Sequence, residues 1–594
     1  MLDRKDILPE PELPKGAELV SEGQGQARDW QVGPSAFLTH TGHRSEAEFK
    51  RARAASARIM QHAQMGFRDA GKSRRAYAEI YERCRQQGAT VDRYGISLDW
   101  SMGYPAERRD TRFAGTGLVL NGPEDFAELA RMAPVAAHFG DFVLGFPAAV
   151  ENTRAALSAG STSIGNLGQF FTFRLPGWDD DVATARATVT ALALIAAQKT
   201  EVLVHSNLDD GFAALFTDTA CSLGAVLIEK HIIEDLIGAP LSHCYGHHFT
   251  DPMKRLAFHL ALGRVSDTPG TMVYGNTMAY RRDAAGNFAS LASYLLTDII
   301  GQMAAPTGHA INPVPVTENV RIPDIDEIVD AQCFASRLIE HAGGLLPAFS
   351  LEAATAIADI LVREGRRFRD RVLAGLEGAG IDLNDPFEML LAIRRIGSRR
   401  LEELYGPGRK DEARPRGRAP AVASPTLDGI EELAHSALAE ITSETRGHIA
   451  GAGLSALIAT TDVHEHSKLL VEQVFGELGV TIIDGGVSVD ADDLAAMAAE
   501  TGADVIALST YNGVALEFAQ ALLGEVEKAE IHVPLLIGGR LNQIPRNSNS
   551  SLPVEVEDEL VEAGAVVCRN IADAALALAK LAQEGSTARE PRRP

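Results

Sequence analysis

Short apolar runs that end in polar clusters alternate with helix-like stretches along most of this 594-residue chain. A parallel connection between neighbouring strands needs a crossover, so this alternation predicts parallel βα units. Seven or more units in a row predict an N-terminal (β/α)8 TIM-like barrel with extra helices, rather than one open sheet. The runs that we interpret as its strands are YGISLDW, DFVLGF, STSIGN, EVLVHSN, AVLIEKH, GTMVYGN and TGHAINP.

A second alternation begins after residue 426. Its helix-like stretches separate five apolar runs, which are LSALIAT, VTIIDGG, DVIALST, VPLLIGG and AVVCRN. Five strands in so short a segment predict a small, doubly wound (flavodoxin-like) α/β domain. In such a domain ligands bind at the carboxyl ends of the strands, near the switch point of the sheet.

Changes of composition mark the boundaries between these parts. The first residues are rich in proline, glycine and charge, and proline, glycine and arginine again replace apolar residues between the two alternations. The stretch 46–88 is helical by composition and spacing. The predicted segments are an N-terminal arm (1–45), the barrel domain (46–405), a linker (406–426), the doubly wound domain (427–585) and a disordered tail (586–594).

Composition restricts the class of protein. The formal net charge is −24 and the sequence pI is about 5.2, which argues against a nucleic-acid partner. The five cysteines form no CxxC pair, so neither a disulfide framework nor a zinc knuckle is indicated. There is no apolar run long enough to cross a membrane and no signal-peptide pattern at the N-terminus. We therefore expect a cytoplasmic protein with no membrane partner.

Three polar or glycine-rich clusters follow strands of the doubly wound domain. The first holds Asp462, His464 and Ser467, the second Ser509 and Tyr511, and the third Gly538 and Gly539. Forty-one residues separate Ser467 from Ser509, and twenty-six separate Tyr511 from Gly538. All three clusters are expected at one edge of the sheet.

This pattern resembles the cobalamin-binding domain family, whose motif is DxHxxG, then SxL, then GG, with gaps of the same size. The sequence departs from the motif at two positions, with Ser467 in place of glycine and Tyr511 in place of leucine. Serine is small enough to keep a close approach to the corrin tail. Tyr511 would crowd the nucleotide tail or hydrogen-bond to it.

The resemblance implies a role for each cluster. His464 would replace the benzimidazole of the cofactor as the lower ligand of cobalt, and Asp462 would accept a hydrogen bond from its second ring nitrogen. Ser509 and the bare backbone of Gly538 and Gly539 would accommodate the displaced tail. For His466 the family offers no role, and a surface position is the simpler interpretation.

A barrel that precedes a cobalamin domain resembles the adenosylcobalamin-dependent mutases, in which the barrel closes over the corrin and shields radicals from solvent. Within this group the chain is most similar to glutamate mutase and 2-methyleneglutarate mutase, which isomerise free carboxylic acids. Runs such as GTGLVLNGPEDF and MVYGNTMAY contribute to this resemblance. The resemblance implies adenosylcobalamin as cofactor and a small carboxylic acid as substrate.

Three alternatives remain open. An acyl-CoA mutase would carry an N-terminal signature that is not evident here. An aminomutase would bind pyridoxal phosphate through a lysine eleven residues after the cobalt-ligating histidine, where this chain has Phe475; Lys468 is near but wrongly spaced. A corrinoid carrier or sensor would bind cobalamin without turnover.

A free carboxylate substrate calls for guanidinium groups, which bind carboxylates through two hydrogen bonds. The loop after YGISLDW supplies Arg108, Arg109 and Arg112, with Arg93 and Arg174 as weaker candidates. Amide, imidazole and carboxylate groups at other predicted strand ends would complete the site. The candidates ranked highest are Glu229, His231, His205, Asn207 and Tyr274, ahead of Asn166, Gln169, Asn276, His309 and Asn312.

Two further features complete the sequence-based hypothesis. The cluster HCYGHH (243–248) fits no standard metal spacing, so a loop with satisfied side chains is the favoured interpretation. A barrel that opens and closes, together with an N-terminal arm, suggests a homodimer in which the arm wraps around its neighbour.

Overall fold

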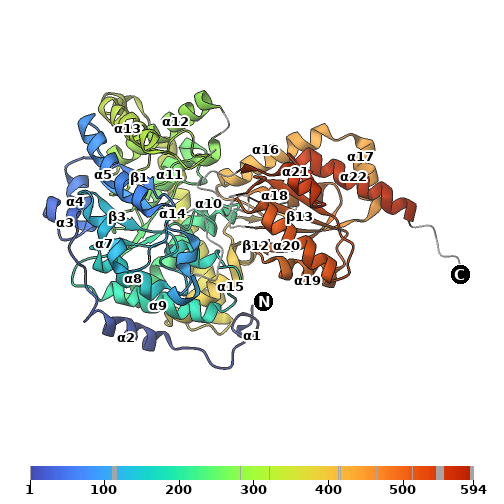
Figure 1. The fold of residues 1–594 in the computed structure, drawn as a ribbon, viewed down its shortest axis with the longest axis horizontal. Coiled ribbons are helices and arrows are strands. Elements are labelled where there is room, and N and C mark those ends of the chain that lie inside the picture. The colour runs from blue at the N-terminus through green and yellow to red at the C-terminus, as the bar shows by residue number, and fades with distance from the viewer. Residues whose placement is uncertain are drawn as a thin grey trace. The chain divides into compact units, whose positions relative to one another are not determined.

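The computed structural model describes residues 2–109, 117–280, 283–319, 321–412, 414, 416–461, 466–510, 513–543 and 554–588. The chain forms two compact units (Figure 1). Unit 1 consists of Met1–Thr172 and Asp180–Pro425, and unit 2 of Phe173–Asp179 and Thr426–Pro594.

Eight parallel strands make up the centre of unit 1. Six of them form one sheet in the order β1-β2-β3-β4-β5-β6, and β7 pairs with β8. Parallel bridges between Tyr245 and Val273 and between Gln61 and Ile311 connect the two groups at both ends. The strands are β1 (His62–Met65), β2 (Arg93–Ile96), β3 (Ala136–Phe139), β4 (Ser163–Ile164), β5 (Leu203–Ser206), β6 (Leu241–His243), β7 (Met272–Val273) and β8 (Ala310–Ile311).

Helices lie around these strands (Figure 1). The α-helices of unit 1 are α1 (Arg4–Ile7), α2 (Gly16–Gln26), α3 (Ala36–Thr41), α4 (Glu46–Ala55), α5 (Ala70–Gln86), α6 (Ala106–Arg109), α7 (Pro123–Arg131), α8 (Ala149–Ser158), α9 (Asp181–Ala196), α10 (Thr219–Lys230), α11 (Pro252–Leu262), α12 (Ala284–Ala304), α13 (Ile325–Leu345), α14 (Glu352–Gly378) and α15 (Pro386–Tyr405). Short 3-10 helices, η1 (Trp100–Gly103), η2 (Leu167–Phe171), η3 (Ala213–Leu215), η5 (Thr277–Ala279) and η6 (Leu346–Ala348), and one π-helix, η4 (His231–Ile237), complete the unit.

A buried polar network occupies the amino ends of these strands. Arg93, the first residue of β2, is fully buried and donates to Glu46 of α4 at 2.8 Å and to Ser163 at 3.1 Å. Lys50, one turn further along α4, donates to the carbonyl oxygens of Thr271 and Gly308. Burial lowers the pKa of Lys50 to about 8. Helix α4 thus closes the amino ends of the strands with paired charges.

Three sequence predictions for unit 1 were wrong. Within the stretch predicted to be helical, HAQM forms β1, which has no β-branched residue to mark it. DFVLGF is a turn, and the strand is the alanine-rich AAHF just before it. AVLIEKH belongs to α10, which is buried on nearly all sides and therefore lacks the polar face that identifies a helix in a sequence.

The N-terminal segment packs on its own chain. Helix α2 lies against α9, and Arg4 forms a 2.5 Å ion pair with Glu388. Ile7 and Leu19 are buried in the core of unit 1. The segment is therefore part of this core in the described chain, and the homodimer stays a prediction.

Residues 406–425, expected to form a linker, are hydrogen-bonded to unit 1. They contain a two-stranded antiparallel ribbon of β9 (Arg409–Lys410) and β10 (Arg418–Ala419). The carboxylate of Asp218 accepts the backbone N–H groups of Ala421 at 2.7 Å and Val422 at 3.1 Å. These contacts hold Ala421 and Val422 against α10, which the proline- and arginine-rich composition does not reveal.

Unit 2 contains a five-stranded parallel sheet in the order β12-β11-β13-β14-β17. All five strands fall in the apolar runs of the sequence, so the predicted parallel C-terminal sheet is confirmed. The strands of unit 2 are β11 (Ser455–Thr460), β12 (Thr481–Val487), β13 (Val505–Thr510), β14 (Leu535–Gly539), β15 (Asn542–Gln543), β16 (Val554–Glu555) and β17 (Val566–Cys568), and its helices are α16 (Pro425–Glu440), α17 (Ser443–Ala452), α18 (His466–Glu477), α19 (Ala491–Thr501), α20 (Ala515–Lys528), α21 (Glu557–Glu562) and α22 (Ile571–Ala588).

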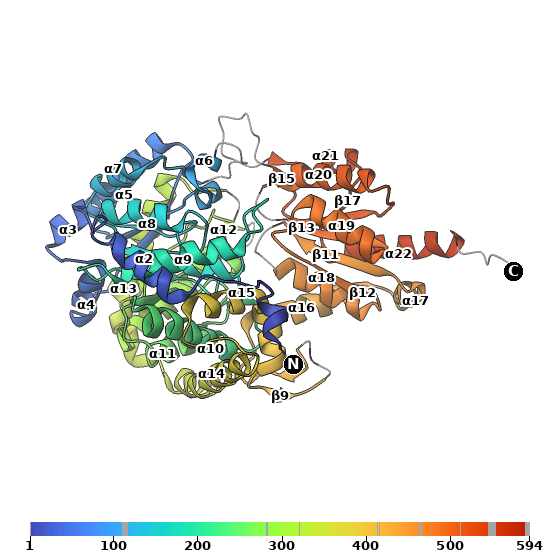
Figure 2. The same cartoon turned by 90° about the horizontal axis from the view of Figure 1, so that it is seen from below.

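Alternate residues of the central strands build two separate cores. In β11, Ala456 and Ile458 pack with α16, α17, α18 and α22, whereas Leu457 and Ala459 pack with α19, α20 and α21. Helices therefore cover both faces of the sheet (Figure 2). This is the doubly wound arrangement, in which both faces of a strand are apolar and the polar groups gather at its ends.

Among the described residues, no single helix has the length and apolar character to span a membrane. One pair of helical segments, Ile325–Ala348 and Glu352–Gly378, is bent at its junction and reaches this length and apolar character only when the two are taken together.

Gly23 and Gly25 test the packing of α2. A Cβ at Gly23 would collide with the carbonyl oxygen of Thr190 in α9, whereas a Cβ at Gly25 would meet no atom within 4 Å. We expect Gly23→Ala to lower the free energy of unfolding by about 1–3 kcal/mol. Gly25→Ala should raise it by about 0.5–1 kcal/mol, because alanine loses less entropy in a helix. Urea denaturation measures the free energy of unfolding of both variants. Equal changes in the two variants would contradict the packing of α2 on its own chain.

Candidate functional site

The carboxyl ends of β11, β13 and β14 lie side by side in unit 2. In the parallel register Thr460 pairs with Ser509, and Ser509 pairs with Gly538. The backbone N–H of Thr461 donates to the carbonyl oxygen of Ser509 at 3.0 Å, which holds the turn after β11 against β13. Thr460, just before the first motif cluster, therefore lies at the same edge of the sheet as Ser509 and Gly538, which begin the second and third.

This edge carries small residues. Ser509 is buried and Gly538 has no side chain. Gly539 has a φ of +95°, and a Cβ there would collide with the carbonyl oxygen of Thr510. Glycine is therefore required at 539, both by its backbone conformation and by the lack of space. Backbone is accessible here without bulky side chains, and this fits a large ligand that must approach the strand ends closely.

The remaining motif residues are only partly described. Ser467 is half-buried in the first turn of α18. Asp462, His464 and Tyr511 lie outside the described residues, so their predicted roles stay predictions.

Lys468 is buried and engaged by two carboxylates. Its ammonium group lies 2.5 Å from Glu472 and 2.7 Å from Asp484 of β12. The pair with Asp484 ties α18 to the edge of the sheet. Both ion pairs would have to break before this amine could attack a carbonyl group. Lys468 therefore does not fit the imine-forming lysine of an aminomutase.

Polar side chains converge at the carboxyl ends of the strands in unit 1. Asn207 follows β5, Asn276 follows β7 and Asn312 follows β8, and all three are at most 4% exposed. The amide oxygens of all three, and the amide nitrogen of Asn312, have no hydrogen-bond partner among the described residues. Buried polar groups are normally satisfied, so such a group of unsatisfied atoms indicates a place where a polar ligand binds.

Three carboxylates lie at the same strand ends. Asp141 comes two residues after β3, and burial raises its pKa to about 6, with the charge of Asp210 adding to the shift. Asp209 accepts the backbone N–H groups of Gly246 at 2.7 Å and His248 at 3.4 Å, and burial raises its pKa. These bonds join the loop after β5 to the loop after β6.

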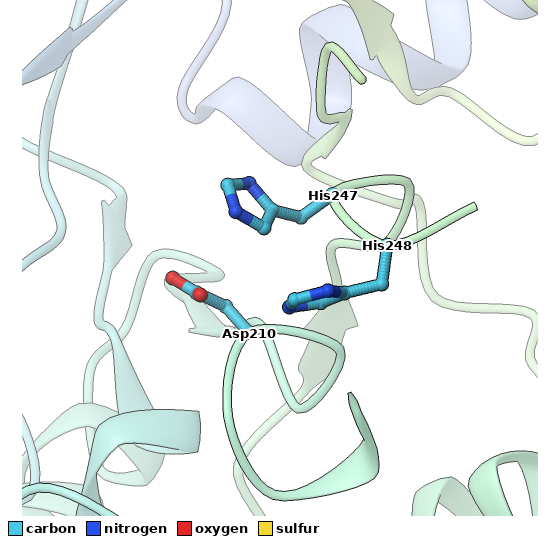
Figure 3. A group of neighbouring side chains, drawn as sticks. All are labelled: Asp210, His247 and His248. Carbon is cyan, nitrogen blue, oxygen red and sulfur yellow. The ribbon is translucent and has the colours of Figure 1, made fainter. Parts of the chain in front are cut away.

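Two histidines of the HCYGHH loop face Asp210 (Figure 3). The ligand atoms of Asp210, His247 and His248 all lie within 4.8 Å of one another. The ring of His247 also lies edge-on to the ring of Tyr274, with 5.2 Å between centroids. Burial raises the pKa of Tyr274 well above its usual value, so its hydroxyl stays neutral and can donate a hydrogen bond. The cluster thus combines metal-binding and hydrogen-bonding groups.

A cavity of about 190 Å³ lies at the ends of β1, β2, β7 and β8. Its polar lining includes Gln64, Ser97, Tyr274 and Asn312. The volume suits a small molecule, and the unsatisfied amide of Asn312 supplies both a donor and an acceptor to it.

His205 lies deeper than the strand ends. Its Nδ1 is 2.8 Å from the hydroxyl of Thr271, and its ring lies 4.5 Å from that of His138. Burial lowers the pKa of both histidines well below the usual value, so they are neutral. His205 thus belongs to the polar interior, next to Asn207 at the end of β5.

Glu229 and His231 do not lie at a strand end, because AVLIEKH is helical. The buried carboxylate of Glu229 accepts a 2.6 Å hydrogen bond from Ser206 and lies 3.2 Å from Nε2 of His243. It holds α10 against β5 and β6. His231 begins η4 and pairs with Asp235 at 3.0 Å. Neither residue joins the convergent polar groups.

The arginine candidates have structural partners. The guanidinium group of Arg109 donates to the carbonyl oxygen of Tyr104 at 3.1 Å and to Oδ1 of Asn152 at 3.1 Å. Arg108 is exposed on α6, and Arg112 lies outside the described residues. Arg93 is held by Glu46 in the interior, and Arg174 pairs with Asp179, Asp490 and Asp493 in unit 2.

Sequence reasoning missed Asp141, Asp209 and Asp210. The two consecutive aspartates follow EVLVHSN after a single leucine, and this position at a predicted strand end was a usable signal. Asp141 gave no such signal, because it begins DFVLGF. This run is predicted to be a strand, but it forms the turn after β3.

Residues 456–554 match the family described as the B12 binding domain. The match spans β11 to β16 and contains all three motif clusters. No curated protein matches the chain. The protein is therefore a cobalamin-binding protein, and its cofactor is a cobalamin. The end of β14 fits this cofactor, since Gly538 is partly exposed and Gly539 is exposed, and both offer bare backbone to its tail.

Asn312 and Asn152 distinguish a ligand-binding amide from a structural one. In the part of the chain that the structure describes, the side-chain amide of Asn312 has no hydrogen-bond partner, whereas Asn152 donates to the carbonyl oxygens of Met102 at 2.8 Å and Phe142 at 3.2 Å. Asn312→Leu should raise the free energy of unfolding by about 1–2 kcal/mol, because it removes unsatisfied buried atoms. Asn152→Leu should lower it by about 1–3 kcal/mol, because it leaves partners unsatisfied. Chemical denaturation without ligands provides the values, and a destabilised Asn312→Leu would mean that this amide is structural.

Proposed function

We propose that this protein is an adenosylcobalamin-dependent mutase that rearranges the carbon skeleton of a small free carboxylic acid. One observation carries the proposal: a B12 binding domain shares its chain with a parallel α/β unit whose strand ends gather buried, unsatisfied polar atoms. A cobalamin carrier or sensor needs the B12 binding domain, but it does not need a second unit with unsatisfied polar atoms at its strand ends.

We further propose that unit 1 is a (β/α)8 barrel. The strand pairing supports this, because it proceeds from β1 to β8 in order and returns to the start through the bridge between Gln61 and Ile311. Active sites of such barrels lie at the carboxyl ends of the strands. Asn207, Tyr274 and Asn312 follow strands at these ends.

Adenosylcobalamin supplies, when bound, the radical that abstracts a hydrogen atom and returns it after the rearrangement. His464 would bind its cobalt, and Asp462 would orient the imidazole. Ser509, Gly538 and Gly539 would accommodate the tail, with Ser467 and Tyr511 beside it.

The other residues bind and orient the substrate. Asn207 offers its amide oxygen, and Asn312 its whole amide group, without a competing partner among the described residues. The neutral hydroxyl of Tyr274 can donate to a carboxylate or carbonyl oxygen. Removing such a group should lower kcat/KM by about 10- to 100-fold, since a hydrogen bond to a charged group contributes about 1.5–3 kcal/mol.

Nuclear magnetic resonance tests the reaction. The protein with adenosylcobalamin is incubated with glutamate, 2-methyleneglutarate and related free acids, and separately with acyl-CoA thioesters and with amino acids plus pyridoxal phosphate. We expect isomerisation of a free acid only, and loss of most of the rate in Asn312→Leu. Turnover that requires a thioester or pyridoxal phosphate would contradict the proposal, as would tight cobalamin binding without any turnover.

His464 and His466 provide a matched pair for the cofactor site. The resemblance assigns the cobalt to His464 and no role to His466, two residues further on. We expect His464→Ala to weaken cobalamin binding strongly and His466→Ala to leave it within about twofold, a difference of less than 0.5 kcal/mol. Electron paramagnetic resonance of the Co(II) form with ¹⁵N-labelled protein should show a protein nitrogen on cobalt. Coupling to the benzimidazole of the cofactor instead would contradict the assignment.

A further inference from the structure

The carboxylates that follow β3 and β5 in unit 1 are unfavourable for an anionic substrate. Asp141 follows β3, and Asp209 and Asp210 follow β5. A free carboxylate entering this region is repelled unless a cation compensates. Arg109, in the loop expected to supply the compensating charge, has structural partners instead.

Two loops bring three metal-ligand side chains together at this point. Asp210 comes from the loop after β5, and His247 and His248 come from the loop after β6 (Figure 3). Their ligand atoms lie within 4.8 Å of one another. Metal–ligand bonds of about 2.1 Å place ligand atoms roughly 3–3.5 Å apart. Small side-chain rotations would bring the three ligand atoms to this separation.

The supporting contacts hold these loops in position. The Oδ2 atom of Asp209 accepts the backbone N–H groups of Gly246 and His248, so the histidine loop is fixed to the loop that carries Asp210. Oδ1 of Asp210 is buried without a hydrogen-bond partner in the part of the chain that the structure describes. A carboxylate oxygen that is neither solvated nor bonded is available to a cation.

We propose that Asp210, His247 and His248 bind a divalent first-row transition-metal ion. Two imidazoles and one carboxylate suit Zn²⁺, Fe²⁺ or Mn²⁺, and three protein ligands leave coordination positions open. In its second part the inference rests on the proposed function: the open positions take a carboxylate of the substrate, and the ion supplies positive charge beside Asp210.

Metal binding is measured on the full chain without cobalamin, so that no cobalt is present. After treatment with a chelator, Zn²⁺ is titrated by calorimetry into the wild type, Asp210→Asn, His247→Gln and His231→Gln. The last variant is the matched control, because it removes an imidazole of unit 1 that pairs with Asp235 away from the cluster.

We expect one Zn²⁺ per chain in the wild type and in His231→Gln, and binding weakened at least about 10- to 100-fold in the other two variants. Cu²⁺ bound to the wild type should show electron paramagnetic resonance coupling to two imidazole nitrogens, which requires no variant to fold. Wild-type binding no tighter than that of a folded His247→Gln, or Cu²⁺ coupled to fewer than two nitrogens, would overturn the site. Because neither readout needs substrate or cobalamin, failure here is distinct from failure to find a mutase reaction.

Discussion

Parallel pairing of strands is the constraint on which both candidate sites depend. In a parallel sheet every strand ends at the same edge, so residues far apart in the chain meet there. In unit 2 this brings Thr460, Ser509 and Gly538 into one row, although seventy-seven residues separate the first from the last. In unit 1 the same geometry gathers Asn207, Asn276 and Asn312. The buried central strands supply rigidity, and the loops that follow them carry the chemistry.

Electrostatics separates the two ends of the strands in unit 1. At the amino ends, Arg93, Lys50 and Glu46 satisfy one another in a fully buried network. At the carboxyl ends, amide atoms of Asn207, Asn276 and Asn312 and one carboxylate oxygen of Asp210 have no hydrogen-bond partner among the described residues. Paired charges at one end stabilise the fold, whereas the unsatisfied groups at the other end carry a cost that binding can offset. This asymmetry, and not the fold alone, supports an active site at the carboxyl ends.

The sequence predicts unit 2 better than unit 1. Strands such as LSALIAT and DVIALST are apolar on both faces and bounded by clear breaks, so composition identifies them. The short strands of unit 1 carry buried polar residues, as in HAQM, and alanine, as in AAHF, and both patterns look helical. The opposite error concerns helix α10, which is buried on nearly all sides and therefore shows no helical periodicity in the sequence. Its sequence predicts a strand, and this prediction wrongly places Glu229 and His231 at a strand end. The structural role of Arg109 could not be assigned from sequence, because its partner Asn152 lies in α8 and comes close only in the tertiary structure.

The motif clusters were recognisable because residue type and spacing had to agree at three places, and the match to the B12 binding domain covers all of them. The central claim, a radical rearrangement of a free acid, is tested most directly by isotope transfer. The protein is incubated with adenosylcobalamin and a fully deuterated form of the acid that it isomerises, and the cofactor is analysed by mass spectrometry. The account predicts deuterium in the 5′-methylene group of the adenosyl moiety. Isomerisation with no deuterium in the cofactor would contradict it.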